Sequence, residues 1–149
     1  MLKVLAESWS KNQNKLKEYL TSNLESLNYY SYEDIVRITF HNIYEGEDKL
    51  NVNHLTEIDD GDYQGTLLFV IPFQTYQPGP GEYLMTYVSY GSCSGCDTLQ
   101  SLHYCSDINE KISGFMVLCK DILTNTIKPN NEGWRFSKQW EQIEWNGSF

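Results

Sequence analysis

The most constraining feature of the sequence is an apolar run, LLFVIPF, at residues 67–73. The run is too short to span a bilayer, and its apolar residues are consecutive, which is typical of a strand that is buried on both faces. An Asp-Gly pair precedes the run at residues 60–61, and a QPGPG segment follows it at residues 77–81. Both segments favour turns. We therefore predict a strand over residues 63–73, with residues 67–73 at the centre of a sheet.

Two further strands are predicted, one before and one after this run. Residues 50–58 show the alternation of side chains that is typical of a strand, and the Asp-Gly pair that follows favours a hairpin. Residues 83–90, with the sequence YLMTYVSY, are rich in the aromatic residues that strands prefer. The predicted sheet is therefore antiparallel and has at least three strands.

The first part of the chain is predicted to be helical. Leucine and tryptophan recur there at spacings of three, four or seven, which predicts a long amphipathic helix ending near residues 26–28. Ser31 and Asp34, three residues later, resemble a capping box. This box predicts a second helix over residues 32–43, followed by a charged loop at residues 45–49.

A further helix is predicted after the sheet. Ser106 is a suitable N-cap, because apolar residues follow it at helical spacings from Ile108 to Ile122. Helices at both ends of a small antiparallel sheet define an α+β fold, and 149 residues suit a single domain, residues 1–149. The predicted core includes Leu16, Leu20, Leu24, Leu68, Val70, Val88, Leu99, Ile112, Phe115 and Cys119.

The composition restricts the possible partners. The net charge is −9 and the isoelectric point is near 4.7, so the chain lacks the basic stripe that a nucleic-acid partner requires. No apolar segment is long enough to cross a membrane, and the apolar residues 1–6 are too few for a signal peptide. We therefore expect a cytoplasmic protein with no membrane partner, whose cysteines are reduced thiols.

The turn after the third predicted strand contains the first candidate site. Its sequence, GSCSGCD, places Cys93 and Cys96 in a Cys-x-x-Cys motif. Ser94 and Asp97 resemble a second capping box, which predicts that Ser94 caps a short helix and that Cys96 lies in its first turn. The amides and dipole at a helix start lower the pKa of a thiol. The candidate thiol or ligand site therefore comprises Ser92, Cys93, Ser94, Cys96 and Asp97.

Four interpretations of this turn stay open. A redox pair would use the thiolate, although the chain lacks the strand–helix alternation of a thioredoxin fold after the motif. A zinc site would use Cys93, Cys96, His103 and Cys105, but a continuous helix would hold Cys96 and Cys105 about 13 Å apart. The amides and hydroxyls of residues 91–95 could hold a small anion, or the cysteines could simply be buried. No metal and no cofactor is therefore predicted, with zinc as the alternative.

A second candidate site is an acidic and aromatic surface. Three aspartates occupy the predicted hairpin turn over residues 59–62, and their spacing does not match a calcium-binding loop. Three tryptophans lie within residues 134–145, and tryptophan is a frequent anchor of protein interfaces. The candidate binding surface comprises Asp59, Asp60, Asp62, Trp134, Trp140 and Trp145.

The segment YGSCSGCDTLQ at residues 90–100, preceded by an aromatic strand, resembles part of small uncharacterised proteins encoded by bacteriophages and other large DNA viruses. The resemblance extends over residues 60–102 and implies no activity and no functional residue. It implies a small acidic viral protein that binds a host protein. The sequence thus favours a non-enzymatic binding protein, with thiol redox chemistry, zinc binding or anion binding at residues 91–95 as alternatives.

Overall fold

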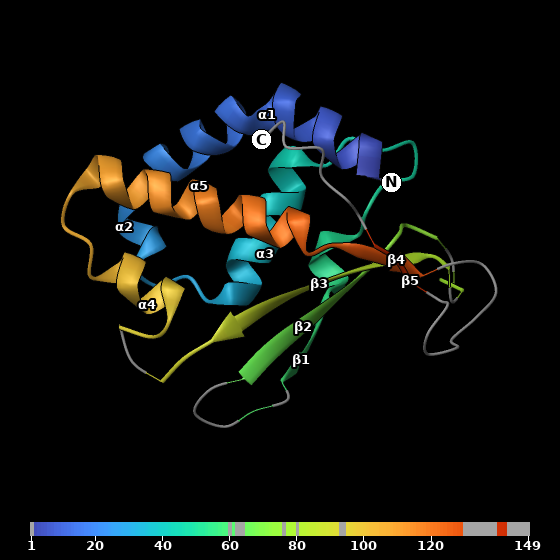
Figure 1. Ribbon diagram of the computed structural model, residues 1–149. Coiled ribbons are helices and arrows are strands. Elements are labelled where there is room, and N and C mark those ends of the chain that lie inside the picture. Colours follow the sequence, from blue (N-terminus) through green and yellow to red (C-terminus); the bar gives the residue numbers. More distant parts are fainter. Residues whose placement is uncertain are drawn as a thin grey trace.

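The computed structural model describes residues 2–59, 61, 65–75, 77–79, 81–92, 95–129 and 140–142. One antiparallel sheet carries a layer of helices on one side, which confirms the predicted α+β fold (Figure 1). The elements in chain order are α1 (Leu2–Ser22), α2 (Leu24–Leu27), α3 (Tyr32–Ile43), the 3-10 helix η1 (Val52–His54), β1 (Thr56–Asp59), β2 (Gly65–Pro72), β3 (Tyr83–Tyr90), α4 (Thr98–His103), α5 (Ile108–Thr124), β4 (Ile127–Pro129) and β5 (Trp140–Gln142).

The predicted N-terminal helix is present, but it is interrupted before its end. α1 ends at Ser22, and Asn23 separates it from the single turn of α2. The side-chain amide of Asn23 donates to the carbonyl of Tyr19 at 2.7 Å and so satisfies one acceptor at the helix end. The residues of the predicted apolar stripe that are fully buried are Leu5, Leu16, Leu20 and Leu27.

Two buried polar side chains of α1 attach it to the end of α3. The amide of Asn12 donates to the carbonyl of Ile43 at 3.0 Å. Ile43 is the last residue of α3, so this carbonyl has no partner within the helix. The hydroxyl of Ser8 accepts from the backbone amide of Glu45 at 3.2 Å. The buried face of α1 therefore supplies hydrogen bonds as well as apolar contact.

The capping box predicted for the second helix is present. The side chain of Ser31 accepts from the backbone amide of Asp34, and the Asp34 carboxylate accepts from the amide of Ser31 at 2.9 Å. α3 spans the predicted residues 32–43 and contacts both α1 and α5. Because α3 packs against both helices, most of its side chains are buried.

The sheet has the strand order β1-β2-β3-β4-β5, and every neighbouring pair is antiparallel. β2 lies between β1 and β3, so the predicted central position of the apolar run is confirmed. β3 covers the predicted residues 83–90. In the register of these three strands, Ile58 is opposite Leu68, and Leu68 is opposite Tyr87.

Only one face of β2 is covered, although we predicted burial on both. Leu67, Phe69 and Ile71 are buried against the helical layer. Leu68 and Val70, which were predicted core residues, point to the opposite face and are only partly buried, because successive side chains of a strand alternate.

The remaining core predictions have two outcomes. Leu24 was predicted to be a core residue, but it is only partly buried where it packs against the core. The predicted core residues that are confirmed are Leu16, Leu20, Val88, Leu99, Ile112, Phe115 and Cys119.

The strand predicted over residues 50–58 is shorter than expected. Leu50 forms an isolated bridge with Phe73, η1 follows, and β1 begins only at Thr56. Leu50 and Leu55 are both buried. An uninterrupted strand would point them to opposite faces, because they are an odd number of residues apart. The tighter turn of η1 lets both side chains reach the core.

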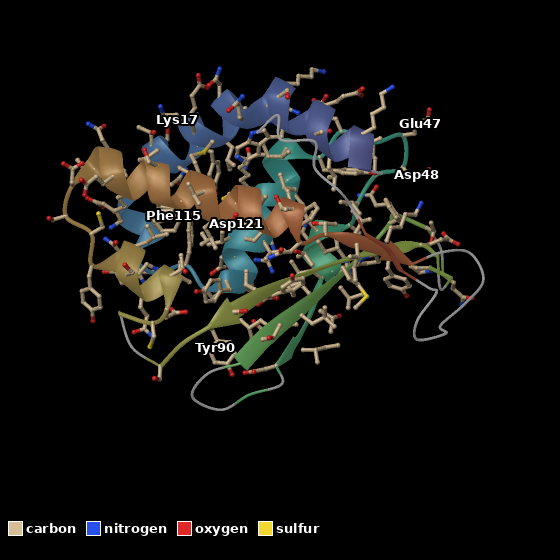
Figure 2. The ribbon with its side chains drawn as sticks, viewed as in Figure 1. Lys17, Glu47, Asp48, Tyr90, Phe115 and Asp121 are labelled. Carbon is tan, nitrogen blue, oxygen red and sulfur yellow. The ribbon has the colours of Figure 1, made fainter. Side chains whose placement is uncertain are left out.

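α5 fastens the helical layer to the sheet. Its N-cap is Asp107, one residue after the predicted Ser106, and the Asp107 carboxylate accepts from the amide of Glu110 at 3.0 Å. Phe115 points from α5 into the molecule and is fully buried (Figure 2). The buried hydroxyl of Thr86 in β3 donates to the carbonyl of Ile122 in α5 at 2.6 Å.

The last strand adds to the sheet at the edge opposite β1. β5 pairs with β4, whereas residues 130–139 and 143–149, which include the rest of the tryptophan-rich segment, lie outside the described residues. The sequence pattern of Pro129 to Gly133 predicts a loop, but Pro129 belongs to β4. In the part of the chain that the structure describes, no helix combines the length and apolar character needed to cross a membrane.

The two faces of β2 are distinguished by substitutions at adjacent positions. We expect Phe69→Ala to lower the free energy of unfolding by about 3–5 kcal/mol, because it leaves a cavity in the core. Leu68→Ala should cost about 1 kcal/mol, because its side chain is partly solvated. Urea unfolding monitored by circular dichroism measures both losses. Equal losses, or a larger loss for Leu68→Ala, would contradict this assignment of faces.

Candidate functional site

The predicted thiol site lies in the turn that joins β3 to α4. The helix begins at Thr98, and its N-cap is Asp97, whose carboxylate accepts from the backbone amide of Gln100 at 3.0 Å. The prediction that Ser94 caps this helix is therefore wrong, and Cys96 precedes the helix instead of lying in its first turn. A carboxylate is at least as good an N-cap as a hydroxyl, and Asp97 has further partners that fix it there.

Asp97 is the structural centre of this turn. Its side chain is 5% exposed, and its Oδ1 accepts from the hydroxyl of Tyr32 at 2.6 Å and from the amide of Gly91 at 3.2 Å. The Tyr32 oxygen accepts in turn from the amide of Leu99 at 3.1 Å. Burial raises the pKa of Tyr32, and its hydrogen bond to Asp97 raises it further, so the hydroxyl remains a donor. Asp97 thus ties the end of β3 and the start of α4 to α3.

The turn also requires glycine at position 91. A Cβ on Gly91 would lie 2.6 Å from the carbonyl carbon of Cys96 and 3.0 Å from its Sγ. The chain therefore folds back on itself closely enough to exclude any other side chain there. In this arrangement the hydroxyl of Ser92 is 3.8 Å from the Cys96 thiol. Cys93 and Ser94 lie outside the described residues.

A cleft of about 500 Å³ adjoins the turn. The residues that line it include Cys96, Thr98 and Ser101, together with Leu102 of α4 and Val117 of α5. Cys96 is exposed, so a small reagent can reach it. The described residues that line the cleft include no histidine, lysine or arginine.

The other residues of the zinc alternative are placed as follows. His103 ends α4, and burial together with the nearby Lys111 lowers its pKa. Lys111 itself is 7% exposed and donates to the side-chain oxygen of Asn28. The Cys105 thiol donates to the carbonyl of Asp107 at 3.6 Å. Nowhere in the described part of the chain do three or more His, Cys, Asp or Glu side chains form a group that could hold a metal ion.

Of the three aspartates in the predicted acidic surface, Asp59 is the one among the described residues. Asp59 is exposed at the end of β1, where its carboxylate accepts from the hydroxyl of Tyr90 at 2.7 Å and from the amide of Gly61 at 3.0 Å. These hydrogen bonds lower the pKa of Asp59, with that of Tyr90 contributing most. Figure 2 shows Tyr90 at the end of β3, where it is opposite Gly65 at the start of β2. For Trp140 only the backbone in β5 is described, and the residues outside the described part are Asp60, Asp62, Trp134 and Trp145.

A surface that the sequence did not predict is the side of the sheet away from the helices. We call its exposed and partly exposed apolar residues Ile58, Leu68, Val70 and Tyr87 the open face, whereas Met85, opposite Val70 on the same side, is buried. Ile58, Leu68 and Tyr87 form one row across β1, β2 and β3, and Ile58 and Tyr87 are 49% and 43% exposed. All the helices lie on the other side of these strands (Figure 1). A signal was available in the sequence, because the polar Thr66 and Ser89 share this side of the sheet.

A hollow of about 410 Å³ adjoins the row. Its lining includes Thr56 and Val70, which are paired across β1 and β2, and Pro72 and Tyr83, which are paired across β2 and β3. The row and the hollow together form an amphipathic surface with a recess large enough for a partner's side chain.

The chain was compared with known protein families, curated proteins and solved structures. No protein-family model, no curated protein and no solved structure matches this chain significantly. A function must therefore be argued from the residues of the sites themselves.

The hydrogen bonds around Asp97 are tested by Tyr32→Phe. This variant removes the donor to Asp97 and the acceptor of the Leu99 amide, so we expect it to lower the free energy of unfolding by about 1–3 kcal/mol. Tyr104→Phe is the matched control, because Tyr104 is 79% exposed, and it should change stability little. A loss no larger than that of the control would contradict the role given to this hydrogen bond.

Tyr32→Phe should also change how the free energy of unfolding depends on pH. The pKa of Tyr32 in the folded protein is raised above the ordinary value of 10.0, so deprotonation favours the unfolded state. The stability that depends on the Tyr32 hydroxyl is complete below pH 10 and is lost as the pH rises further. Tyr32→Phe should therefore lose less stability than the wild type between neutral and strongly alkaline pH. Parallel pH profiles of unfolding free energy would refute this expectation.

The thiols should differ in reactivity. Cys119 is fully buried, and burial raises its pKa to about 12, whereas Cys96 is exposed. Because the thiolate is the reactive form, we expect iodoacetamide at mildly alkaline pH to modify Cys96 and to spare Cys119 until the protein is unfolded in urea. Peptide mass spectrometry distinguishes the sites. Modification of native Cys119 as fast as Cys96 would show that the core is not closed as described.

Proposed function

We propose that this protein is a small acidic binding protein that recognises another protein through the open face of its sheet. The observation that carries the proposal is the row of Ile58, Leu68 and Tyr87, whose apolar surface continues across three strands while Ile58 and Tyr87 remain nearly half exposed. Single exposed apolar residues are normal, but contiguous apolar patches mark interaction sites, because covering them removes apolar surface from water.

The rigidity of this surface supports the proposal. Its residues belong to paired strands, and the carbonyl of Tyr87 also accepts from the side-chain amide of Asn125 at 3.1 Å. A preformed surface loses little conformational entropy when a partner binds. Tyr87 supplies the kind of side chain that recurs in protein interfaces, with an apolar ring and a polar hydroxyl.

The charge of the protein supports one class of partner. The net charge of −9 favours encounter with basic protein surfaces and opposes binding to nucleic acid. Glu57 and Asp59 are exposed on β1, on either side of Ile58 in the sequence. Because exposed charges are screened by salt, binding that uses them should weaken as the ionic strength rises.

Affinity capture from a bacterial lysate tests the proposal, because the viral resemblance implies a bacterial host partner. The immobilised wild type is compared with the double variant Ile58→Thr, Tyr87→Ser, and capture is measured at low and high salt. The matched control is Ile108→Thr, Tyr29→Ser, since Ile108 and Tyr29 are exposed by 57% and 87% on the helical side.

We expect the wild type and the control to retain the same protein and the open-face variant to lose it. Circular dichroism must show that the wild type and both variants are folded. Retention that is equal in all three, or no retained protein at low salt, would refute binding through the open face.

A further inference from the structure

We propose that the partner binds by adding an extended segment to the free edge of β1, and that this segment alternates apolar and basic residues. The inference rests on the proposed binding function and specifies its geometry and the chemistry of the partner.

The first step is the availability of the edge. β1 is the outermost strand of the sheet, and among the described strands it pairs only with β2. All four of its residues are exposed. The outer side of an edge strand presents backbone donors and acceptors that can pair with another extended chain. β1 therefore offers hydrogen bonds in addition to the apolar contact of the open face.

The second step is the chemistry of the two sides of β1. Thr56 and Ile58 share the open face, whereas Glu57 and Asp59 point to the side of the helices. The side chains of an added strand alternate in the same way. Its apolar residues would extend the row that starts at Ile58, and its basic residues would lie beside Glu57 and Asp59.

The third step is the unbalanced negative charge at this edge. Burial raises the pKa of Glu57, and the nearby carboxylates of Glu33 and Asp59 raise it further. Arg37 pairs with Glu33 at 3.3 Å and with Asp34 at 3.1 Å. In the described part of the chain, neither Glu57 nor Asp59 forms an ion pair, so cationic side chains of a partner would relieve their mutual repulsion.

The same carboxylates disfavour a second copy of this chain as the occupant. Two β1 strands paired around a twofold axis would bring Glu57 and Asp59 of one copy close to those of the other. Like charges opposite each other destabilise strand pairing. The charge at this edge therefore favours a basic extended partner over self-association.

A synthetic peptide provides a defined probe. The probe is a fluorescently labelled peptide of four Val-Lys repeats, and its affinity for the full chain is measured by fluorescence anisotropy. Three control peptides separate the requirements. A Val-Val-Lys-Lys repeat keeps the composition but not the alternation, a Val-Glu repeat inverts the charge, and replacement of the two central valines by proline removes backbone donors.

Two double charge reversals of the protein form a matched pair. Glu57→Lys with Asp59→Lys changes the β1 edge, whereas Glu47→Lys with Asp48→Lys makes the same change in net charge on the loop after α3. Glu47 and Asp48 are exposed and lie near the start of α1 (Figure 2). We expect the Val-Lys peptide to bind at least about tenfold more tightly than each control peptide. The reversal on β1 should weaken it about tenfold, with little effect of the reversal on the loop.

The outcomes that would contradict strand addition differ in which explanation they support. Equal binding of the Val-Lys and Val-Val-Lys-Lys peptides, or equal losses in the two reversals, would mean unspecific charge attraction and would overturn strand addition. A dimer in sedimentation velocity that Ile58→Lys dissociates would also overturn it, in favour of a second copy. Capture from lysate that depends on Ile58 and Tyr87, but not on Glu57 and Asp59, would refute this inference and leave the proposed function intact.

Discussion

Burial of one face of β2 and β3 against the helices is the interaction on which the rest of the structure depends. Phe69, Ile71 and Leu84 are fully buried on this face, and the hydroxyl of Thr86 bonds α5 directly to the sheet. Because side chains alternate along each strand, covering one face fixes the register of the sheet and leaves Ile58, Leu68, Val70 and Tyr87 at least partly exposed on the other face. The helical layer thus decides at once where the core lies and where a partner could bind.

The turn with the cysteines is held by a different interaction. The buried Asp97 carboxylate joins three segments through the Tyr32 hydroxyl and the amides of Gly91 and Gln100. A buried carboxylate is stable only when such donors replace its hydration. These hydrogen bonds hold Gly91 and the start of α4 against α3, and Cys96 is exposed just before the helix.

The charged side chains of β1 restrict which partners can pair with the edge of the sheet. Edge strands are prone to uncontrolled pairing, and charged side chains are a common protection against it. Glu57 and Asp59 oppose pairing with another acidic copy while they attract a basic segment. Protection from self-association and selection of a basic partner therefore follow from the same two carboxylates.

The sequence by itself determined the elements whose signals are local. The Ser31 capping box defined α3, and the aromatic residues 83–90 defined β3, because these preferences act within a few residues. Only the tertiary structure decided the N-cap of α4, since Tyr32, which holds Asp97, is 65 residues away in the chain. It also decided that Leu68 and Val70 face outward: residues 67–71 are apolar on both faces of β2, and the polar Thr66 and Ser89 mark the outward side only once the strands are paired.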